Sequence, residues 1–381
     1  MDFSLTEAQE ALRKSITEFS IKELGGDMRA REKGGTFFRD GWDRCAAFGI
    51  QGLPMPTEYG GTGESIVECM IAMQALGATC DDSGLLFTLS SHMWTCEIPI
   101  LLFGSAAQKE RWLPPMIRGE IIGCHAMSEP GSGSDAFSLR TLATKVDGGY
   151  RITGGKTFIS NAPIAGIFLV FATVNPKKGW AGVTGFLVER DNPGLTVGQP
   201  LDKMGLKTSP TSEIHLEDCF VQGDAILGKI GGGSAIFNAE MEWERSCLFA
   251  AHLGAMQRQL DVCVAYAKDR KQFGQTIGSF QAISHKIADM RVRIEIGELL
   301  LHKVAWAKAK GQRAPMESAI AKLVVSEAYV ASSLDAIQIH GGYGFMTEVG
   351  VERDLRDAIG GRLYSGTSEI QRNIIASLLG L

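Results

Sequence analysis

Hydrophobic positions in the first third of the chain recur at helical spacing. Leu12, Ile16 and Phe19 form one apolar stripe that follows a capping residue within the sequence SLTE, as expected where a helix packs one side against a core. Similar patterns cover residues 66–76, 97–102 and 108–117. Pro114 and Pro115 are expected to interrupt the last of these runs early. The pattern predicts an N-terminal α-helical domain over residues 1–120.

The pattern changes near residue 121, where short apolar runs rich in β-branched and aromatic residues alternate with turns. The longest run covers residues 167–174, and shorter ones cover 150–153, 185–188 and 212–216. Because few helical signals separate these runs, they predict an antiparallel β-sandwich or β-barrel rather than alternating strands and helices. The central β-domain is expected to cover residues 121–225.

Helical spacing returns after three consecutive glycines at 231–233 and continues to the end of the chain. Long runs cover about 234–270, 279–310, 315–340 and 368–379. Helices of this length commonly pack as a bundle, so residues 226–381 are expected to form a C-terminal α-helical bundle. The expected fold class is α+β multidomain, in the order helical, β, helical.

Composition is that of a soluble globular protein, with 45% hydrophobic and 21% charged residues among 381. A net charge of −5 without a basic stripe argues against nucleic acid as a partner. Eight scattered cysteines without a CxxC pair are typical of reduced, buried thiols rather than disulfides or a metal site. The first residues lack the features of a signal peptide, and no apolar run reaches the length of a membrane span. A cytoplasmic location without membrane contact is therefore expected.

One stretch within the first long C-terminal run stands out. Residues 240–247 read EMEWERSC, which puts Glu240 and Glu244 on one helix face ahead of a continuous apolar sequence. An acid in such a place is either a solvated helix edge or a catalytic base. Spacing alone favours the solvated edge.

Five further motifs combine glycine with polar or aromatic residues. Each has an ordinary structural explanation as a turn, a strand end or a helix cap. Each also suits a ligand, because glycine lets a ligand approach the backbone and a helix N-terminus attracts anions. His340, in the fourth motif, is as consistent with a structural role as with a functional one. The motifs are MSEPGSGSD (127–135), KTFISN (156–161), DRKQFG (269–274) followed by Phe280, QIHGGYGF (338–345) and YSGTSEIQR (364–372).

In their order and spacing, these motifs resemble the signatures of the acyl-CoA dehydrogenase superfamily over essentially the whole chain. The resemblance implies an N-terminal helical domain, a central β-domain and a C-terminal four-helix bundle. It also implies FAD as the cofactor, bound between the domains and across a subunit interface of a homotetramer. Its members oxidise acyl thioesters and pass the electrons to a flavoprotein carrier or to O2, a choice that the sequence leaves open.

The resemblance assigns residues to the cofactor and the substrate. The flavin ring would be bordered from the β-domain by His125, Met127, Ser128, Phe158 and Ser160, and contacted at the start of the last helix by Thr367 and Glu369. The adenosine diphosphate part would be held, from a neighbouring subunit, by Arg270, Gln272, Phe273, Phe280, Gln338, Gly341 and Gly342. Ser134 matches a position that touches the pantetheine or phosphate arm of the thioester.

The chemistry of the superfamily needs a carboxylate that removes the α-proton of the acyl group while a hydride leaves to flavin. Burial suits such a carboxylate, because it raises the pKa. Most members carry it immediately before the Gly-Thr of the last motif, where this chain has Ser365. A minority, typified by the isovaleryl-CoA enzymes, carries it on the bundle helix directly before an arginine, where this chain has Glu244 and Arg245. Glu244 is therefore the expected base.

The neighbours of this base have predicted roles of their own. Glu240 and Glu242 are expected to be solvated. Trp243 is expected to narrow the acyl pocket, and Arg245 to orient the site.

The preferred substrate is a prolyl group tethered to an acyl or peptidyl carrier protein in secondary-metabolite biosynthesis, because the motifs also resemble those of flavoproteins that oxidise such groups. The alternative is a short branched-chain acyl-CoA such as isovaleryl-CoA. Two other classes stay open: an enzyme of the same fold with other flavin chemistry, such as an N-hydroxylase or nitroalkane oxidase, and a flavin-free binding protein.

Overall fold

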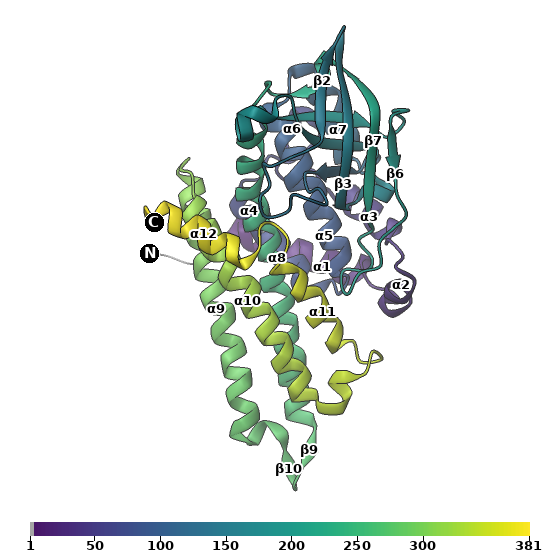
Figure 1. Cartoon of the computed structure of the whole chain (residues 1–381). Coiled ribbons are helices and arrows are strands. Elements are labelled where there is room, and N and C mark those ends of the chain that lie inside the picture. Colours follow the sequence, from purple (N-terminus) through teal and green to yellow (C-terminus); the bar gives the residue numbers. More distant parts are fainter. Residues whose placement is uncertain (1–3) are drawn as a thin grey trace.

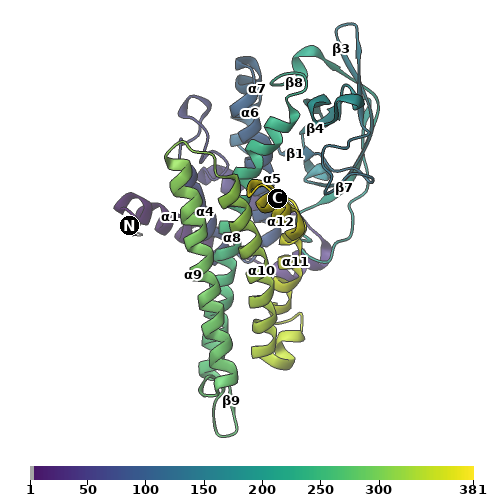
Figure 2. The same cartoon turned by 60° about the vertical axis from the view of Figure 1, so that its left-hand side comes forward.

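The computed structural model describes residues 4–381, in which helices, then strands, then helices follow one another along the chain. Figure 1 shows the strands gathered at one end of the molecule and long C-terminal helices extending to the other end. The turned view in Figure 2 places the N-terminal helices and the β-domain on opposite sides of helix α8 (Gly233–Asp269). The predicted fold class is confirmed.

The N-terminal region is helical, with α1 and α5 packed against the apolar α4. Helix α1 begins with the expected kind of cap: the Thr6 side chain accepts a hydrogen bond from the Gln9 amide, and the Gln9 side chain accepts one from the Thr6 amide. The helices are α1 (Glu7–Glu23), α2 (Met28–Gly34), α3 (Arg39–Phe48), α4 (Ile66–Thr79), α5 (Ser83–His92), α6 (Ile98–Phe103) and α7 (Ala106–Ile117).

Helix α7 does not end early at its prolines, so that expectation was wrong. Pro114 and Pro115 lie inside the helix, which continues to Ile117. Proline is most costly in a helix interior, where it removes a donor and clashes with the preceding turn. Both prolines lie in the last turn, and their carbonyls accept hydrogen bonds from the amides of Arg118 (3.2 Å) and Glu120 (3.0 Å). The helix end therefore stays satisfied.

Helices α5 and α6 are joined by a π-helical turn, Met93–Glu97, into one continuous apolar segment. With 21 residues and a mean hydropathy of 1.3 in its most apolar window, Ser83–Phe103 is long and apolar enough to cross a membrane. The expectation that no run reaches such a length was therefore wrong. Since 89% of that window is buried inside the protein, the segment packs as a core helix.

The central region is one eight-stranded sheet in the order β6-β7-β3-β2-β4-β5-β8, with β1 paired to β4. Most neighbouring strands are antiparallel, as predicted. Strand β4 also pairs in parallel with β1 and, at one residue pair, with β2, so the sheet is mixed. The strands are β1 (Gly123–Ala126), β2 (Leu142–Val146), β3 (Gly149–Ser160), β4 (Ile167–Thr173), β5 (Val183–Glu189), β6 (Leu195–Val197), β7 (Thr211–Gln222) and β8 (Ile226–Leu227).

Strand β4 joins the two hydrophobic cores of the protein. All seven of its residues are buried, and successive side chains point to opposite faces of the sheet. Phe168 and Val170 pack inside the β-domain, whereas Leu169 and Phe171 pack against the helices. A strand buried on both faces explains why this run reads as continuously apolar rather than alternating.

The C-terminal region is the predicted bundle, formed by α8, α9, α10 and α12. The β9–β10 hairpin at the far end of the molecule connects α8 to α9 (Figure 1). Helix α11, which the sequence did not suggest, lies between α10 and α12. The remaining elements are β9 (Lys271–Gln272), β10 (Gln275–Thr276), α9 (Gln281–Ala309), α10 (Pro315–His340), α11 (Val351–Gly361) and α12 (Ser368–Leu378).

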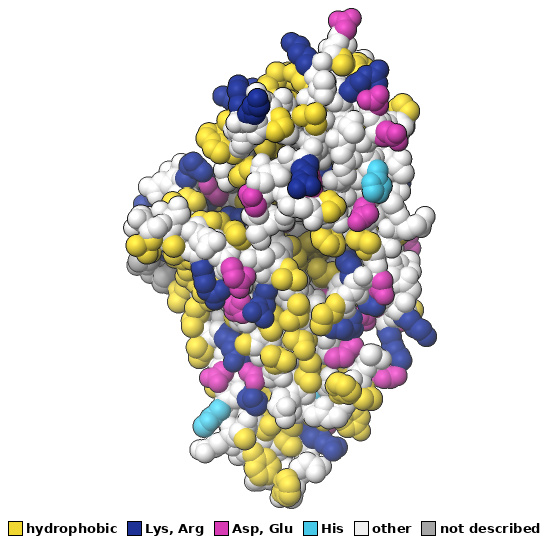
Figure 3. Space-filling view, in the orientation of Figure 1, with side chains coloured by type: hydrophobic (Ala, Val, Ile, Leu, Met, Phe, Trp, Pro, Cys, Tyr) yellow, Lys and Arg dark blue, Asp and Glu magenta, His cyan; other side chains and the backbone are white. Residues whose placement is uncertain are grey.

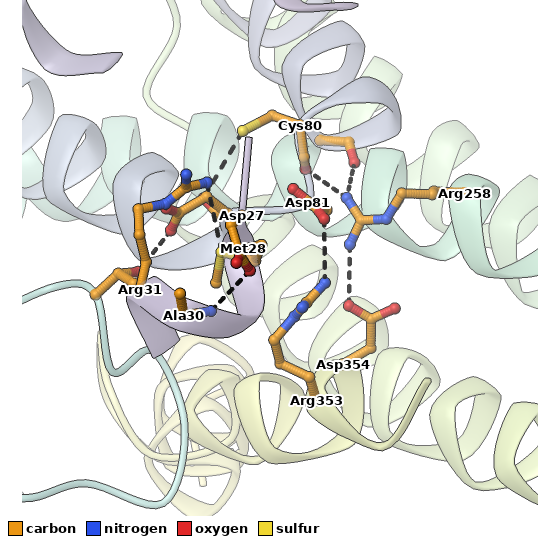
Figure 4. Close-up of polar contacts among 12 residues, drawn as sticks. Asp27, Met28, Ala30, Arg31, Cys80, Asp81, Arg258, Arg353 and Asp354 are labelled. Atoms are coloured by element: carbon orange, nitrogen blue, oxygen red, sulfur yellow. Dashed lines mark hydrogen bonds and ion pairs between the residues drawn. The ribbon is translucent and has the colours of Figure 1, made fainter. Parts of the chain in front are cut away.

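An ionic network fixes α8 against the turn after α4 and against α11 (Figure 4). The Arg258 guanidinium donates hydrogen bonds to the carbonyls of Gly77 and Cys80 and to the Asp354 carboxylate, the last at 2.9 Å. The neighbouring Arg353 pairs with Asp81 at 3.5 Å. One arginine of the bundle thus satisfies carbonyls at the end of an N-terminal helix.

Candidate active site

Glu244 lies in the first third of α8 (Gly233–Asp269), where that helix meets the β-domain and the turn before α12. Its residue is 7% exposed, and the α8 sequence that follows it is buried without interruption through Met256. Burial raises the pKa of the Glu244 carboxyl, and the nearby His125 and Arg245 oppose this rise in part. The Glu244 carboxylate is therefore shielded from water and binds a proton more tightly than an exposed carboxylate does.

Glu240, one helical turn earlier, is also buried, so the expectation that it is solvated was wrong. Its side chain is fully enclosed, and Oε1 lies 2.6 Å from Nε2 of His125 on β1. Burial raises the pKa of Glu240 to about 7, against the effect of His125. The β1 strand that covers this helix face is far away in the sequence, which is why spacing within α8 gave no sign of it.

Glu242 is buried as well, and the same expectation was wrong for it. Its carboxylate pairs with Lys308 (2.6 Å) and Arg313 (3.5 Å), which come from the end of α9 and the loop after it. A charge is tolerated at such a place when cations compensate it. On α8, Glu242 therefore faces away from the Glu240 and Glu244 face.

The segment before α12 brings Ser365 to this site. Ser365 (φ 55°) and Gly366 (φ 85°) both have left-handed backbone conformations, which are uncommon for a residue with a side chain. Arg245 Nε donates a hydrogen bond to the Ser365 carbonyl (3.0 Å), and Gln371 Nε2 donates another (3.1 Å). Arg245, the cation beside Glu244, thus holds the strained turn at Ser365 in place.

Trp243 packs against the π-helical turn of the N-terminal region. Its ring is stacked on Trp94, with centroids 5.8 Å apart and an interplanar angle of 15°. A cavity of about 460 Å³ adjoins Trp243 on the Glu242 side of α8. It is lined by Leu102, Ser234, Ala235, Asn238, Ala239, Glu242, Trp243, Lys308 and Arg313.

The motifs MSEPGSGSD and KTFISN are held together by the buried Lys156, a contact that the sequence alone did not indicate. Lys156 Nζ donates hydrogen bonds to the Met127 carbonyl (3.0 Å) and to Glu129 (2.8 Å), while the Thr157 amide donates to the Ser128 carbonyl (3.0 Å). Burial lowers the pKa of Lys156 to about 8, and Glu129 opposes this. The available signal was a lysine in one motif, Lys156, and an acidic residue in the other, Glu129.

The predicted flavin-side residues of the β-domain lie along the ends of β1 and β3. Met127 is buried, and Ser128 and Ser160 are partly exposed. Phe158 is 73% exposed, with a left-handed φ of 58° at an irregularity in the pairing of β3 with β7. An exposed aromatic ring on a strained backbone is typical of a residue positioned for a ligand. Ser134, in the loop after β1, is exposed.

Thr367 and Glu369 lie at the start of α12. The Thr367 hydroxyl accepts a hydrogen bond from the Ile370 amide (3.3 Å), which makes Thr367 the N-cap of the last helix. Glu369 is exposed, 3.9 Å from Arg372. The N-terminus of this helix directly follows the Ser365 turn.

The predicted adenosine diphosphate group is assembled at the opposite end of α8. Arg270, Gln272, Gly341 and Gly342 all line a cavity of about 480 Å³ between the β9–β10 hairpin and the end of α10. Gln338 is exposed on α10, outside that lining. His340 also lines it, but its ring stacks on Tyr266 with centroids 4.3 Å apart and its Nδ1 lies 2.8 Å from the Ala336 carbonyl, which favours a structural role.

Phe273 lies at the tip of the hairpin and points away from the rest of the chain. It is 93% exposed and has a left-handed φ of 51°, and its ring meets the Phe280 ring edge-on at 6.0 Å. Arg270 follows Glu244 by 26 residues, about 39 Å along a helix that rises 1.5 Å per residue. One chain therefore does not bring the two predicted cofactor groups together.

Comparison with known proteins covers all three regions. Three family models match the chain: the acyl-CoA dehydrogenase N-terminal domain (residues 6–120), middle domain (124–219) and C-terminal domain (231–380). The L-prolyl-[peptidyl-carrier protein] dehydrogenase of Pseudomonas fluorescens is 42% identical over 384 residues, with 100% of both chains covered.

Two solved structures superpose on nearly the whole chain. The prolyl acyl carrier protein oxidase AnaB has a TM-score of 0.98 at 44% identity and covers 99% of this chain and 100% of its own. PigA with FAD and proline has a TM-score of 0.98 at 38% identity, with both chains covered in full. The chain belongs to the acyl-CoA dehydrogenase family.

Proposed function

We propose that this chain is a FAD-dependent dehydrogenase or oxidase that acts on a prolyl group held as a thioester on an acyl or peptidyl carrier protein, in secondary-metabolite biosynthesis. The observation that carries the proposal is the buried Glu244 carboxylate beside the Ser365 turn. A carboxylate in this position has the proton affinity that abstraction of an α-proton near neutral pH requires.

Glu244 is the base of the proposed reaction. The Cα–H bond of the acyl group breaks, its proton goes to the Glu244 carboxylate, and its electron pair stays on the substrate. FAD, when bound, would supply the acceptor for a hydride from Cβ, so that the Cβ–H bond breaks and the Cα–H electron pair forms a Cα=Cβ double bond. Ser365 has no carboxylate to compete for the α-proton, and the hydrogen bond from Arg245 fixes this turn beside the base.

The residues at both ends of α8 fit the two parts of FAD. The exposed Phe158, together with His125, Met127, Ser128 and Ser160, suits a planar ring system. Thr367 and Glu369 close the same side at the start of α12. Arg270, Gln272, Gly341 and Gly342 offer a cation, amides and an accessible backbone, as a diphosphate requires.

A homotetramer accounts for the separation of these two groups. Helix α9 carries a stripe of exposed apolar residues at helical spacing: Val292 (54% exposed), Ile296 (45%) and Leu299 (51%). Figure 3 shows hydrophobic side chains over the lower part of the molecule, down to the tip of the hairpin. Surfaces of this kind mark interfaces. We infer that Phe273, Phe280 and Gln338 act with the Arg270 group on the FAD of a neighbouring subunit.

The stacked rings of Trp94 and Trp243 favour a small acyl group, because they fill space beside the base. Ser134, in the exposed loop after β1, is proposed to contact the extended arm of the carrier-bound thioester. The Pseudomonas fluorescens relative and AnaB are described as acting on prolyl groups of carrier proteins, and PigA was solved with FAD and proline, which supports the same substrate here.

Anaerobic reduction of the purified holoprotein tests the substrate. Prolyl-loaded carrier protein should bleach the flavin absorbance within the time of one turnover, and isovaleryl-CoA should bleach it much more slowly. Bleaching by isovaleryl-CoA alone would overturn the carrier-protein assignment. Oxygen consumption with a free amine or nitroalkane would instead indicate other flavin chemistry on this fold, and a colourless protein would indicate a binding function.

A further inference from the structure

The proposed reaction uses Glu244 as its base and gives no acid–base role to a second pair beside it, Glu240 and His125. Glu240 and His125 are in direct contact at 2.6 Å, and Glu240 is fully buried while 15% of the His125 side chain is exposed. Glu240 and Glu244 are four positions apart on α8, so they lie on one face of the helix, about 6 Å apart along its axis. His125 interacts electrostatically with both of them.

Glu240 differs from a carboxylate whose task is structural. Among residues 4–381, neither of its oxygens has a hydrogen-bond partner beyond the contact with His125. Glu129, also buried, receives three donors, from Lys156 and from the amides of Arg140 and Thr141. A buried carboxylate with unused acceptor capacity is costly to the fold. This cost is offset if a substrate supplies the missing donor.

Charges around the site are arranged along α8. Arg245 is bound to the Ser365 carbonyl (3.0 Å), and Lys322 lies over the Phe249 ring, 5.7 Å from its centroid, further along α8. These positive side chains therefore lie beyond the base. On the other side, the rings of Phe171 and Phe237 pack on His125 with centroids 5.2 and 6.2 Å away. The Glu240 end therefore suits a positive group attached close to the carbon from which Glu244 removes its proton.

The other titratable groups near this end do not neutralise it. Lys156 on β3 acts weakly on His125 and is itself paired with Glu129. Cys96, on the π-helical turn, is buried, and burial raises the pKa of its thiol well above the usual value, so it stays uncharged. Glu240, His125 and Glu244 thus determine the charge that a ligand meets here.

We propose that the Glu240–His125 pair binds the α-amino nitrogen of the substrate and accepts its proton, which makes the site selective for aminoacyl over plain acyl thioesters. The proposal rests on the prolyl function given above. The N–H bond of the ring ammonium breaks, its proton passes to the Glu240–His125 pair, and its electron pair stays on nitrogen. A free lone pair there conjugates with the double bond that forms as the ring is oxidised, so its release assists the reaction. Glu240 and His125 would then set specificity one turn from the base.

Glu240→Gln tests the pair with two substrates on the same carrier protein: the prolyl thioester and the cyclopentanecarbonyl thioester, in which a CH2 group replaces the ring nitrogen. Loss of a charge-assisted contact should lower kcat/KM for the prolyl thioester by on the order of 10- to 100-fold. The value for cyclopentanecarbonyl should stay within about threefold. An equal loss for both substrates would overturn the proposal, because it would show a structural role only.

Two further measurements separate this proposal from its premises. Glu97→Gln is the matched control, because Glu97 and His92 form another fully buried pair, 3.1 Å apart. This substitution should leave the ratio of the two kcat/KM values unchanged.

Calorimetry can measure the binding of L-proline and of cyclopentanecarboxylate to the FAD-loaded protein, and this measurement does not depend on turnover. Glu240→Gln should weaken the binding of L-proline alone by at least about tenfold. If the unsubstituted protein oxidises no prolyl thioester, the proposed function fails. If it binds both ligands equally, the nitrogen-binding proposal fails.

Discussion

Glu244 and Ser365 meet because Arg245 hydrogen-bonds the Ser365 carbonyl across 120 residues of sequence. The carboxylate is buried on a rigid helix, whereas the serine lies on a left-handed turn. A base on a helix has fewer ways to move than a base on a turn, so its distance to the substrate α-carbon is better defined. The position of Glu244 on α8 therefore determines the chemistry of the site.

Glu244→Gln should lower the rate of flavin reduction by the prolyl thioester by about 1,000-fold or more, because the amide cannot accept the α-proton. FAD content should be unchanged, which the ratio of flavin to protein absorbance measures. Glu244→Asp should keep part of the activity, since it retains a carboxylate at greater distance. Near-normal reduction by Glu244→Gln would exclude Glu244 as the base.

The pH dependence of kcat/KM should report the ionisation of Glu244. Burial raises the pKa of this group, and the base acts only when ionised, so activity should fall as the pH is lowered through a midpoint above the usual carboxylate range of about 4.3. The rate of anaerobic flavin reduction between pH 5 and 9 measures this. A flat profile down to pH 5 would show that the group is not perturbed.

At the scale of elements, the long helices were predictable and the short ones were not. The four runs expected at 234–270, 279–310, 315–340 and 368–379 match α8, α9, α10 and α12 to within two residues. Their length gives the periodicity enough turns to be recognised. Helices α2, α3, α5 and α11 were missed, because short or uniformly apolar segments become helical through tertiary packing rather than through their own pattern.

The site was predictable where its residues match a family signature or a helix cap, and unpredictable where they meet only in the fold. The resemblance to the superfamily pointed to Glu244 and grouped Arg270 with Gly341, and local sequence indicated a cap at the start of the last helix. The burial of Glu240 could not be predicted, because its covering residue His125 is on a distant strand. Lys156 was missed for the same reason, since its partner Glu129 is in another motif. The domain boundaries and the site roles stay predictions.

Arg258 should be essential for the attachment of α8 to its neighbours. Arg258→Ala would leave the Asp354 carboxylate and two carbonyls without their donor, which should lower the free energy of unfolding by about 3–5 kcal/mol. Chemical denaturation measures the change. Arg291→Ala removes an exposed pair with Glu295 and serves as the control, with an expected change below about 1 kcal/mol. If Arg258→Ala lowered the free energy of unfolding no more than Arg291→Ala does, the stabilising role of the Arg258 network would be contradicted.

Asp357, on α11, should make stability depend on pH. Burial raises its pKa to about 7 from 3.8, against the effect of the Leu206 amide, which donates a hydrogen bond to it at 2.6 Å. The folded protein then keeps a proton that the unfolded chain loses, so stability present below pH 4 is lost as the pH rises to 7. The loss is on the order of 4 kcal/mol at most. In denaturant unfolding, the stability of Asp357→Asn relative to the unsubstituted protein should be greater at pH 8 than at pH 5. If the difference in stability between the two proteins were the same at both pH values, this prediction would be contradicted.

At the scale of the whole molecule, assembly and cofactor binding are expected to be coupled. Arg270, in the predicted diphosphate group, lies about 39 Å along α8 from Glu244 (26 residues at 1.5 Å), so each complete site is expected to need a second chain. All eight cysteines are buried, in keeping with the predicted reduced thiols. The cytoplasmic location stays a prediction.

Ile296→Asp should disrupt the proposed tetramer and, with it, FAD retention. The substitution puts a charge in the exposed apolar stripe of α9, where an interface would have to bury it. Light scattering after gel filtration measures the assembly, and the flavin-to-protein absorbance ratio measures the cofactor. Leu142→Asp, at an exposed position on β2, is the control and should change neither. Loss of assembly with full FAD retention would contradict a site shared between subunits.

The most direct test of the account is the intact mass of a prolyl-loaded carrier protein after incubation with the enzyme. The unsubstituted protein should remove two hydrogens from the prolyl group, or four if oxidation continues to an aromatic ring. Glu244→Gln with its full FAD content should leave the mass unchanged. An unchanged mass with the unsubstituted, FAD-loaded protein, or the same loss of hydrogen with Glu244→Gln, would contradict the account.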